Sequence, residues 1–391
     1  MSERSNNRSA MDSANPWYVK YTYILAGLIL TVYAMIVAKS ILIPLLFALF
    51  FSILLSPICG WMESYKIPRI IAALTTLILA SLVVAGIGFF FYTQLLDFVD
   101  DVDMITERMG TLMERSEQFL ATWFGIELMV EFENARDTLI TFIRENSGRL
   151  TTGIAEAASV ITATFLIPVF MFFFLIFRDF LKDFLLMVAS RYDAGTTQNM
   201  ETIINKVKSL VQSYIAGLLI VIFILAIINS VMLLIVGVNH ALFFGVFAAM
   251  LNVIPFIGPI MGSILPIIYA LVTMDSLLYP IVILLAFYVI QLFESNLFTP
   301  VIVGSQVSMN ALSTLLLLFI GAQIWGLVGM ILFIPIGAIL KAVFDEIESL
   351  KPYGYLLGRV PKEKTSQKGP LAEKIQSISE KAKEKVPINK N

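Results

Sequence analysis

One carboxylate, Glu294, stands at the end of an otherwise apolar segment, three residues after Gln291 and two before Asn296. Side chains three residues apart share one face of a helix, so Gln291 and Glu294 would point the same way. A carboxylate at the centre of a bilayer costs about 3 kcal/mol on insertion scales, so this one should face protein, water or a cation. It could bind a proton or a cation, or accept hydrogen bonds from a hydroxylated solute. The alternative is an acid at the headgroup boundary that only caps a helix or pairs with a cation.

The apolar stretch before this segment, residues 241–272, is interrupted by prolines, glycines and one amide. The interrupting residues are Asn252, Pro255, Gly258, Pro259, Gly262 and Pro266. Proline removes a backbone donor and glycine weakens a helix, so the stretch should not run as one straight rod. A broken helix offers free backbone N–H and C=O groups to a small polar or ionic ligand. The Gly258–Gly262 spacing could equally serve only close helix packing.

The apolar stretch after Glu294, residues 311–344, repeats this pattern. It carries Gly321, Gln323, Gly326, Gly329 and Pro335 at its bend and Asn310 at its mouth, and Pro300 and Gly304 precede it as hinge residues. A matched pair of interrupted apolar segments is the best sequence indicator of a transporter's binding site. Residues 241–254 and 311–320 are each too short to cross a bilayer alone. This favours two re-entrant hairpins; the alternative is two full spans kinked at proline.

The composition is that of a membrane protein. Of 391 residues, 58% are hydrophobic and only 14% are charged, with a mean hydropathy of +0.85, whereas soluble domains carry about 25% charged residues. The formal net charge of −2, without a basic groove, gives no indication of nucleic-acid binding. The single cysteine, Cys59, excludes an internal disulfide framework, and with one histidine, His240, no zinc site of the usual kind can form. His240 is expected in a solvated turn, with a pH sensor as the alternative.

Sequence motifs for catalysis are absent. There is no nucleophile elbow, no metalloprotease His-Glu-x-x-His pair and no phosphate-binding loop. We therefore expect neither an enzyme nor an ATP-driven pump, and no cofactor or metal.

Six full spans are predicted from apolar segments near the ~20 residues needed to cross a bilayer. They cover about residues 21–37, 41–59, 70–92, 154–177, 214–236 and 277–293. Lysine and arginine cluster before the first span, after the second and fourth, and in the tail, so both termini are expected in the cytoplasm. The first hairpin would then enter from outside and the second from inside, as in an inverted-topology repeat. Asn229 and Ser230, inside the fifth span, are expected to bond another helix rather than a solute.

The chain divides into six segments on this pattern. They are a cytoplasmic N-terminal segment (1–20), a three-span scaffold (21–92), an extracytoplasmic amphipathic helical hairpin (93–150), the fourth span with a cytoplasmic connector (151–213), a transport core with both broken hairpins (214–344) and a basic, disordered cytoplasmic tail (345–391). The outer hairpin is predicted from apolar residues at heptad spacing between Phe98 and Trp123. Such a seam serves either an intramolecular hairpin or a contact between subunits.

Three strings in the C-terminal half stand out. They are Leu251-Asn-Val-Ile-Pro255-Phe-Ile-Gly258-Pro259, Thr299-Pro300-Val-Ile-Val-Gly304 and Gly326-Leu-Val-Gly329-Met-Ile-Leu-Phe-Ile-Pro335. Together they resemble the autoinducer-2 exporter family of bacterial inner-membrane permeases, over about residues 21–351. The resemblance implies an inner-membrane transporter of autoinducer-2 or a related small polar molecule, and a homo-oligomer, a pentamer in the family.

Two observations leave the identity of the solute undetermined. Some members of the family are described as sodium or lithium/proton antiporters. The chain also departs from the family at Ser308-Met309-Asn310-Ala311, where many members carry a His-Pro pair. No solute is therefore inferred from that loop.

The sequence predicts an all-α polytopic membrane protein with about six full spans, two re-entrant helical hairpins and an outer helical hairpin. We expect a secondary transporter in the lipid bilayer that moves a small polar solute, coupled to H⁺ or Na⁺, by alternating access. Asn252, Gln291, Glu294 and Gln323 are expected to line its site. The alternatives are a sodium (lithium)/proton antiporter centred on Glu294, an oligomeric channel, and a scaffold without transport.

Overall fold

The computed structural model describes residues 16–100, 108, 110–111, 158–191, 194–255, 257–274, 276–303 and 309–358. The predicted outer helical hairpin, the hinge residue Gly304 and the tail beyond residue 358 therefore lie wholly or mostly outside the described residues.

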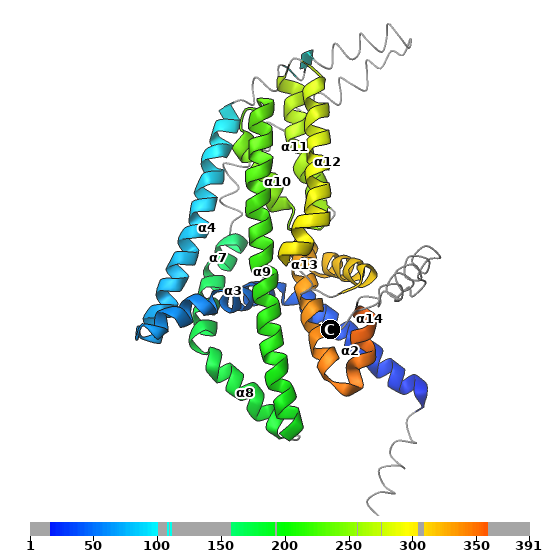
Figure 1. Cartoon of the computed structure of the whole chain (residues 1–391). Helices are drawn as coiled ribbons and strands as arrows, with labels where there is room; N and C mark the ends of the chain where they lie inside the picture. The colour runs from blue at the N-terminus through cyan, green and yellow to red at the C-terminus, as the bar shows by residue number, and fades with distance from the viewer. Residues whose placement is uncertain are drawn as a thin grey trace, which may run out of the picture.

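The described residues fold into helices without a β-strand, which confirms the predicted all-α class (Figure 1). The elements are α2 (Trp17–Val37), α3 (Lys39–Ser64), α4 (Arg69–Asp100), α7 (Ala158–Ile176), α8 (Arg178–Ser190), α9 (Ala194–Val236), α10 (Ala241–Leu251), α11 (Ile257–Thr273), α12 (Leu278–Phe293), the π-helix η1 (Glu294–Val303), α13 (Ala311–Glu346), the 3₁₀ turn η3 (Glu348–Leu350) and α14 (Lys351–Leu357).

Six helices in the described part of the chain are long and apolar enough to cross a membrane. They cover Trp17–Val37, Lys39–Ser64, Arg69–Gln94, Met200–Val236, Leu278–Ile302 and Ala311–Glu346. This confirms a polytopic membrane protein, and five of the six correspond to predicted spans. The predicted fourth span, residues 154–177, contains α7, which is apolar over its 19 residues, and only part of that span lies within the described residues. The second broken stretch, α13, reaches span length only when it is counted through a bend.

The helix α9 connects the two ends of the fold. Its 43 residues extend over ~65 Å, about twice the thickness of a bilayer's hydrocarbon core. One half runs beside α10 and α12, and the other beside α8 and α13 (Figure 1). Leu233 belongs to a buried cluster with residues of α10, α11 and α12, whereas Val211 belongs to one with Trp325 and Phe333 of α13. Both broken stretches thus pack against α9.

Close backbone packing joins α9 to α10. A Cβ atom on Gly245 would lie 2.5 Å from the backbone nitrogen of Ser230 and 2.6 Å from its Cα. Since real Cβ atoms never come so near, only glycine allows these helices to cross at this distance. The crossing lies in the same part of α9 as Asn229.

A proline in α3 explains a hydrogen bond between α3 and α9. Pro57 has no N–H, so the carbonyl of Ile53, four residues earlier, lacks its usual helical donor. The side-chain nitrogen of Gln212, on α9, donates to this carbonyl over 2.8 Å. The bond gives the Ile53 carbonyl a hydrogen-bond donor, which the hydrocarbon of a bilayer could not supply.

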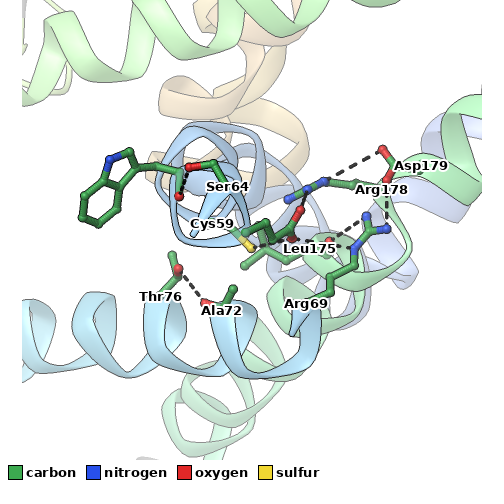
Figure 2. Close-up of polar contacts among 10 residues, drawn as sticks. Cys59, Ser64, Arg69, Ala72, Thr76, Leu175, Arg178 and Asp179 are labelled. Atoms are coloured by element: carbon green, nitrogen blue, oxygen red, sulfur yellow. Dashed lines mark hydrogen bonds and ion pairs between the residues drawn. The ribbon is translucent and has the colours of Figure 1, made fainter. Parts of the chain in front are cut away.

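A network of charged side chains joins the end of α3, the start of α4 and the start of α8 (Figure 2). Arg178 donates to the Glu63 carboxylate, and Arg69 forms an ion pair with Asp179 over 2.8 Å. Arg69 also donates to the carbonyl of Leu175 over 3.4 Å, and the thiol of Cys59 lies 3.5 Å from Glu63. The network ties the α3–α4 turn to the α7–α8 junction.

Candidate functional site

The first broken stretch is a helical hairpin. α10 ends at Leu251 and α11 begins at Ile257. The two helices touch backbone to backbone, because a Cβ on Gly258 would lie 2.9 Å from the Cα of Asn252, and one on Gly262 would lie 2.8 Å from the Cα of Ala248. The predicted tip residues Asn252 and Pro255 lie in the connecting turn, and Pro266 is buried within α11.

A cavity of about 310 Å³ lies between this hairpin, α9 and α12. Its lining residues are Leu225, Asn229, Ala248, Asn252, Pro259, Ile260, Ser263, Ile264, Ile267, Leu284, Phe287, Tyr288, Ile290 and Gln291. Three predicted site residues, Asn252, Pro259 and Gln291, therefore meet at one cavity. None of the lining residues is Asp, Glu, Lys, Arg or His. Ile260 and Tyr288 are exposed, so the cavity opens to the surface of the chain.

Glu294 does not line the cavity, but it holds a residue that does. Its side chain is buried, and its carboxylate accepts hydrogen bonds from the Gln291 amide over 2.7 Å and from the Thr299 hydroxyl over 2.5 Å. The Gln291 amide nitrogen thereby donates to Glu294, and the carbonyl oxygen of the same amide takes no part in that bond.

The π-helix η1 explains the bond between Glu294 and Thr299. In an α-helix, residues five apart lie about 140° apart around the axis, so these side chains would diverge. A π-turn, with its i→i+5 hydrogen bonds, brings residues i and i+5 closer to the same face. The predicted hinge residue Pro300 lies in this π-helix.

The second broken stretch turns within α13. Trp325 and Gly326 leave the helical conformation, and Gly326 has φ 63° and ψ −141°. The two halves fold back on each other, because a Cβ on Gly321 would lie 2.7 Å from the carbonyl carbon of Gly329. The indole N–H of Trp325 donates to the carbonyl of Met35, in the last turn of α2, over 2.9 Å.

The remaining predicted site residues lie elsewhere. Gln323 is exposed on α13 and is not among the cavity residues, and Pro335 is buried in the second half of α13. Asn310 caps α13 by accepting from the Ser313 N–H over 2.7 Å, and its amide donates to the carbonyl of Leu356 over 2.7 Å. Asn296 is exposed and donates to the carbonyl of Leu292 over 2.8 Å. The side chains of both asparagines thus form hydrogen bonds with backbone groups.

Asn229 is a buried polar residue of the cavity that was not predicted to belong to the site. Its side chain is only 4% exposed, and its carbonyl oxygen Oδ1 has no hydrogen-bond partner among the described residues. The predicted helix-to-helix bond of this oxygen is thus not formed. An amide inside an apolar span was the available signal, but its direction toward a cavity depends on the hairpin packing.

Metal binding finds no support in this region. No group of three or more His, Cys, Asp or Glu side chains, in the described part of the chain, is placed to hold a metal ion.

A solute-sized cavity beside a broken helix, in a multi-pass helical fold, is characteristic of membrane transport proteins. The family model described as "AI-2E family transporter" matches residues 25–349, most of the chain. The chain belongs to this family. Membership in a family of transporters indicates transport as its activity.

Curated relatives agree with this assignment at low identity. The chain is 26% identical to "Putative transport protein YrrI" of Bacillus subtilis over 79% of its own length and 87% of that protein. It is 23% identical to "Putative transport protein YueF" of the same species, over 80% of the chain and 85% of the relative. With "AI-2 transport protein TqsA" of Escherichia coli it shares 24% identity over 88% of the chain and 97% of the relative.

Proposed function

We propose that the protein is a secondary transporter that moves a small polar solute by alternating access, through the cavity between α9, the α10–α11 hairpin and α12. The observation that carries the proposal is that Asn252 and Gln291, from two different elements, meet at one cavity beside a helix break. Irregular backbone at membrane depth is tolerated only where protein buries it or where it lines a watery cavity. A solute pathway meets that condition.

The moving parts in this proposal are two re-entrant hairpins, α10–α11 from outside and α13 from the cytoplasm. The turn between α9 and α10 supports a hinge, since Gly237 has φ 87° and His240 has φ 56°. Hinges of this kind are a few residues at the ends of elements that absorb a change in backbone angles. The break at Gly326 is the corresponding point in α13.

Glu294 is the coupling residue in this proposal. Both of its hydrogen bonds come from uncharged groups, Gln291 and Thr299, so the carboxylate could also take up a proton or a cation. Either event would change its bond to Gln291, and thereby the groups that Gln291 presents to a solute. The same observation favours a sodium (lithium)/proton antiporter centred on Glu294 as a second candidate.

The proposed setting is the bacterial inner membrane, with both termini in the cytoplasm and the chain in a homo-oligomer, a pentamer if it follows its family. Autoinducer-2 is the first solute to test, because one relative is named an AI-2 transport protein.

Reconstituted protein tests the proposal. Liposomes would be assayed for autoinducer-2 flux with and without imposed Na⁺ and H⁺ gradients, for the wild-type chain and for Glu294→Gln. Glu348→Gln is the matched control, since its side chain is 82% exposed and lies beyond α13. We expect gradient-dependent flux in the wild type and the control, and its loss in Glu294→Gln.

Other outcomes decide between the alternatives. Cation–proton exchange without autoinducer-2 flux would replace the proposal by the antiporter. Sustained ohmic current across a planar bilayer would indicate a channel. Assembled oligomers that carry no solute and no current would indicate a scaffold.

A further inference from the structure

The side-chain carbonyl of Asn229 is buried within an apolar helix and has no hydrogen-bond partner among the described residues. The residue is only 4% exposed, and its Oδ1 atom is fully buried without a donor among the described residues. An unpaired buried acceptor destabilises a fold, and within a bilayer no solvent relieves it. A group of this kind in a native structure calls for an explanation, such as a partner that binds transiently.

The position of Asn229 identifies where that partner would bind. Asn229 lines the cavity from α9, whereas Asn252 lines it from the α10–α11 hairpin and Gln291 from α12. The Gln291 amide nitrogen donates to Glu294, so any hydrogen bond from a solute to this amide would go to its carbonyl oxygen. Three amide side chains from three elements thus surround one cavity, and the carbonyl oxygen of Asn229 is buried without a donor.

The charge of the lining restricts the solute further. No lining residue carries a formal charge, and nine of the fourteen are apolar. A charged solute would leave water without a counter-charge in the lining, because the Glu294 carboxylate lies outside the lining and is engaged by Gln291 and Thr299. A neutral solute with O–H or N–H donors would satisfy the carbonyl oxygens and pack its carbon skeleton against the apolar wall.

We propose that Asn229 is a solute-contacting residue, whose carbonyl oxygen accepts a hydrogen bond from an O–H or N–H group of a neutral solute bound in this cavity. This inference rests on the proposed function for the identity of the solute. The accessibility of position 229 and the charge selectivity of the cavity can be measured without transport. Ser230 is the natural comparison, because it is also 4% exposed and its Oγ atom also lacks a partner among the described residues, but it packs against Gly245 and is not a lining residue of the cavity. An unpaired buried group alone would therefore not distinguish the two positions, whereas the cavity does.

Cysteine labelling tests the inference without measuring transport. The single native cysteine is replaced in Cys59→Ser, and Asn229→Cys or Ser230→Cys is added to this full-length chain in membranes. Each variant is treated with a neutral, a cationic or an anionic methanethiosulfonate of similar size. We expect Asn229→Cys to react at least about tenfold faster with the neutral reagent than with either charged one, and Ser230→Cys to remain unreactive.

Three labelling results would overturn the inference. An unreactive Asn229→Cys would mean that no small molecule reaches this position. Equal labelling of Ser230→Cys would mean that the reagents enter the helix packing and not the cavity. Equal rates for neutral and charged reagents would remove the argument for a neutral solute.

Asn229→Leu separates solute contact from a structural role. Leucine is of similar size and removes the unpaired carbonyl, so the Tm of the purified protein should stay constant or rise. The KM for autoinducer-2 in liposomes should rise about tenfold, as expected for one lost hydrogen bond. A fall in Tm with unchanged KM would assign Asn229 to helix packing. If the wild-type chain carries no autoinducer-2, the proposed solute fails, and the labelling still decides the role of Asn229.

Discussion

Gly245 determines how closely α9 and α10 approach, and it does so through the backbone of Ser230. Because the nearest atoms include the Ser230 nitrogen and Cα, a methyl group at position 245 cannot be accommodated by a rotamer change. The two helices would have to separate. Their separation would also displace Asn229, the neighbour of Ser230, relative to the hairpin.

Gly245→Ala is therefore expected to destabilise the protein by about 1–3 kcal/mol, the usual cost of overpacking a closely packed contact. The measurement is the thermal unfolding of purified protein in detergent. Gly27→Ala is the control, since no atom lies within 4 Å of a Cβ at that position, and its Tm should not fall. Equal Tm values for the two variants would show that α9 and α10 are far enough apart to accept a methyl group at position 245.

Among the elements, α3 and α9 are joined where a proline removes a helical hydrogen bond. Gln212→Leu should cost about 1–3 kcal/mol, because the carbonyl of Ile53 would be left buried without a donor. In a Pro57→Ala background, residue 57 regains its N–H and can itself bond Ile53, so the same substitution should cost clearly less. A double-mutant cycle in thermal unfolding measures this difference. Additive effects would mean that Pro57 and Gln212 act independently.

The bend in α13 depends on a backbone conformation at Gly326. Its φ of 63° with ψ of −141° lies in a region that residues with a Cβ rarely adopt, and no atom lies within 4 Å of a Cβ placed there. Gly326→Ala should thus cost about 1–3 kcal/mol through backbone strain alone. Gly86→Ala in α4, also in open space, should instead gain up to about 1 kcal/mol in helix propensity. A Tm change of the same sign in both variants would contradict the bend.

The sequence revealed the helix breaks, because proline and glycine act locally. It predicted interruptions between Asn252 and Gly262 and around Gly326, and the helices stop or bend there. It did not predict the π-helix after Glu294, nor that α9 continues through the predicted connector as one helix. Nor could it direct Asn229 toward the cavity, since that depends on packing between residues distant in the chain. Solute binding by the cavity residues stays a prediction.

For the whole molecule, the positions of lysine and arginine predict which end faces the cytoplasm. Arg191, after α8, should lie inside, and Asn239, between α9 and α10, should lie outside. In a Cys59→Ser chain, Arg191→Cys should react with a membrane-impermeant maleimide only in inverted vesicles, and Asn239→Cys only in intact spheroplasts. Labelling of both from one side would overturn the proposed topology.

Because α9 is long, a small tilt of this helix would displace its far end by several ångströms. The tilt would pivot where Val211 and Ile215 pack with the buried residues of α13, and the cavity residues of α9 lie between this pivot and the far end. From Ile215 to Val236 a straight helix extends ~30 Å, so a tilt of about 10° moves its far end by ~5 Å, wider than a water molecule. The same tilt scarcely moves Val211 and Ile215, which lie at the pivot. A small rotation that leaves the α13 bend in place would therefore be enough to open or close the other hairpin's side of the protein.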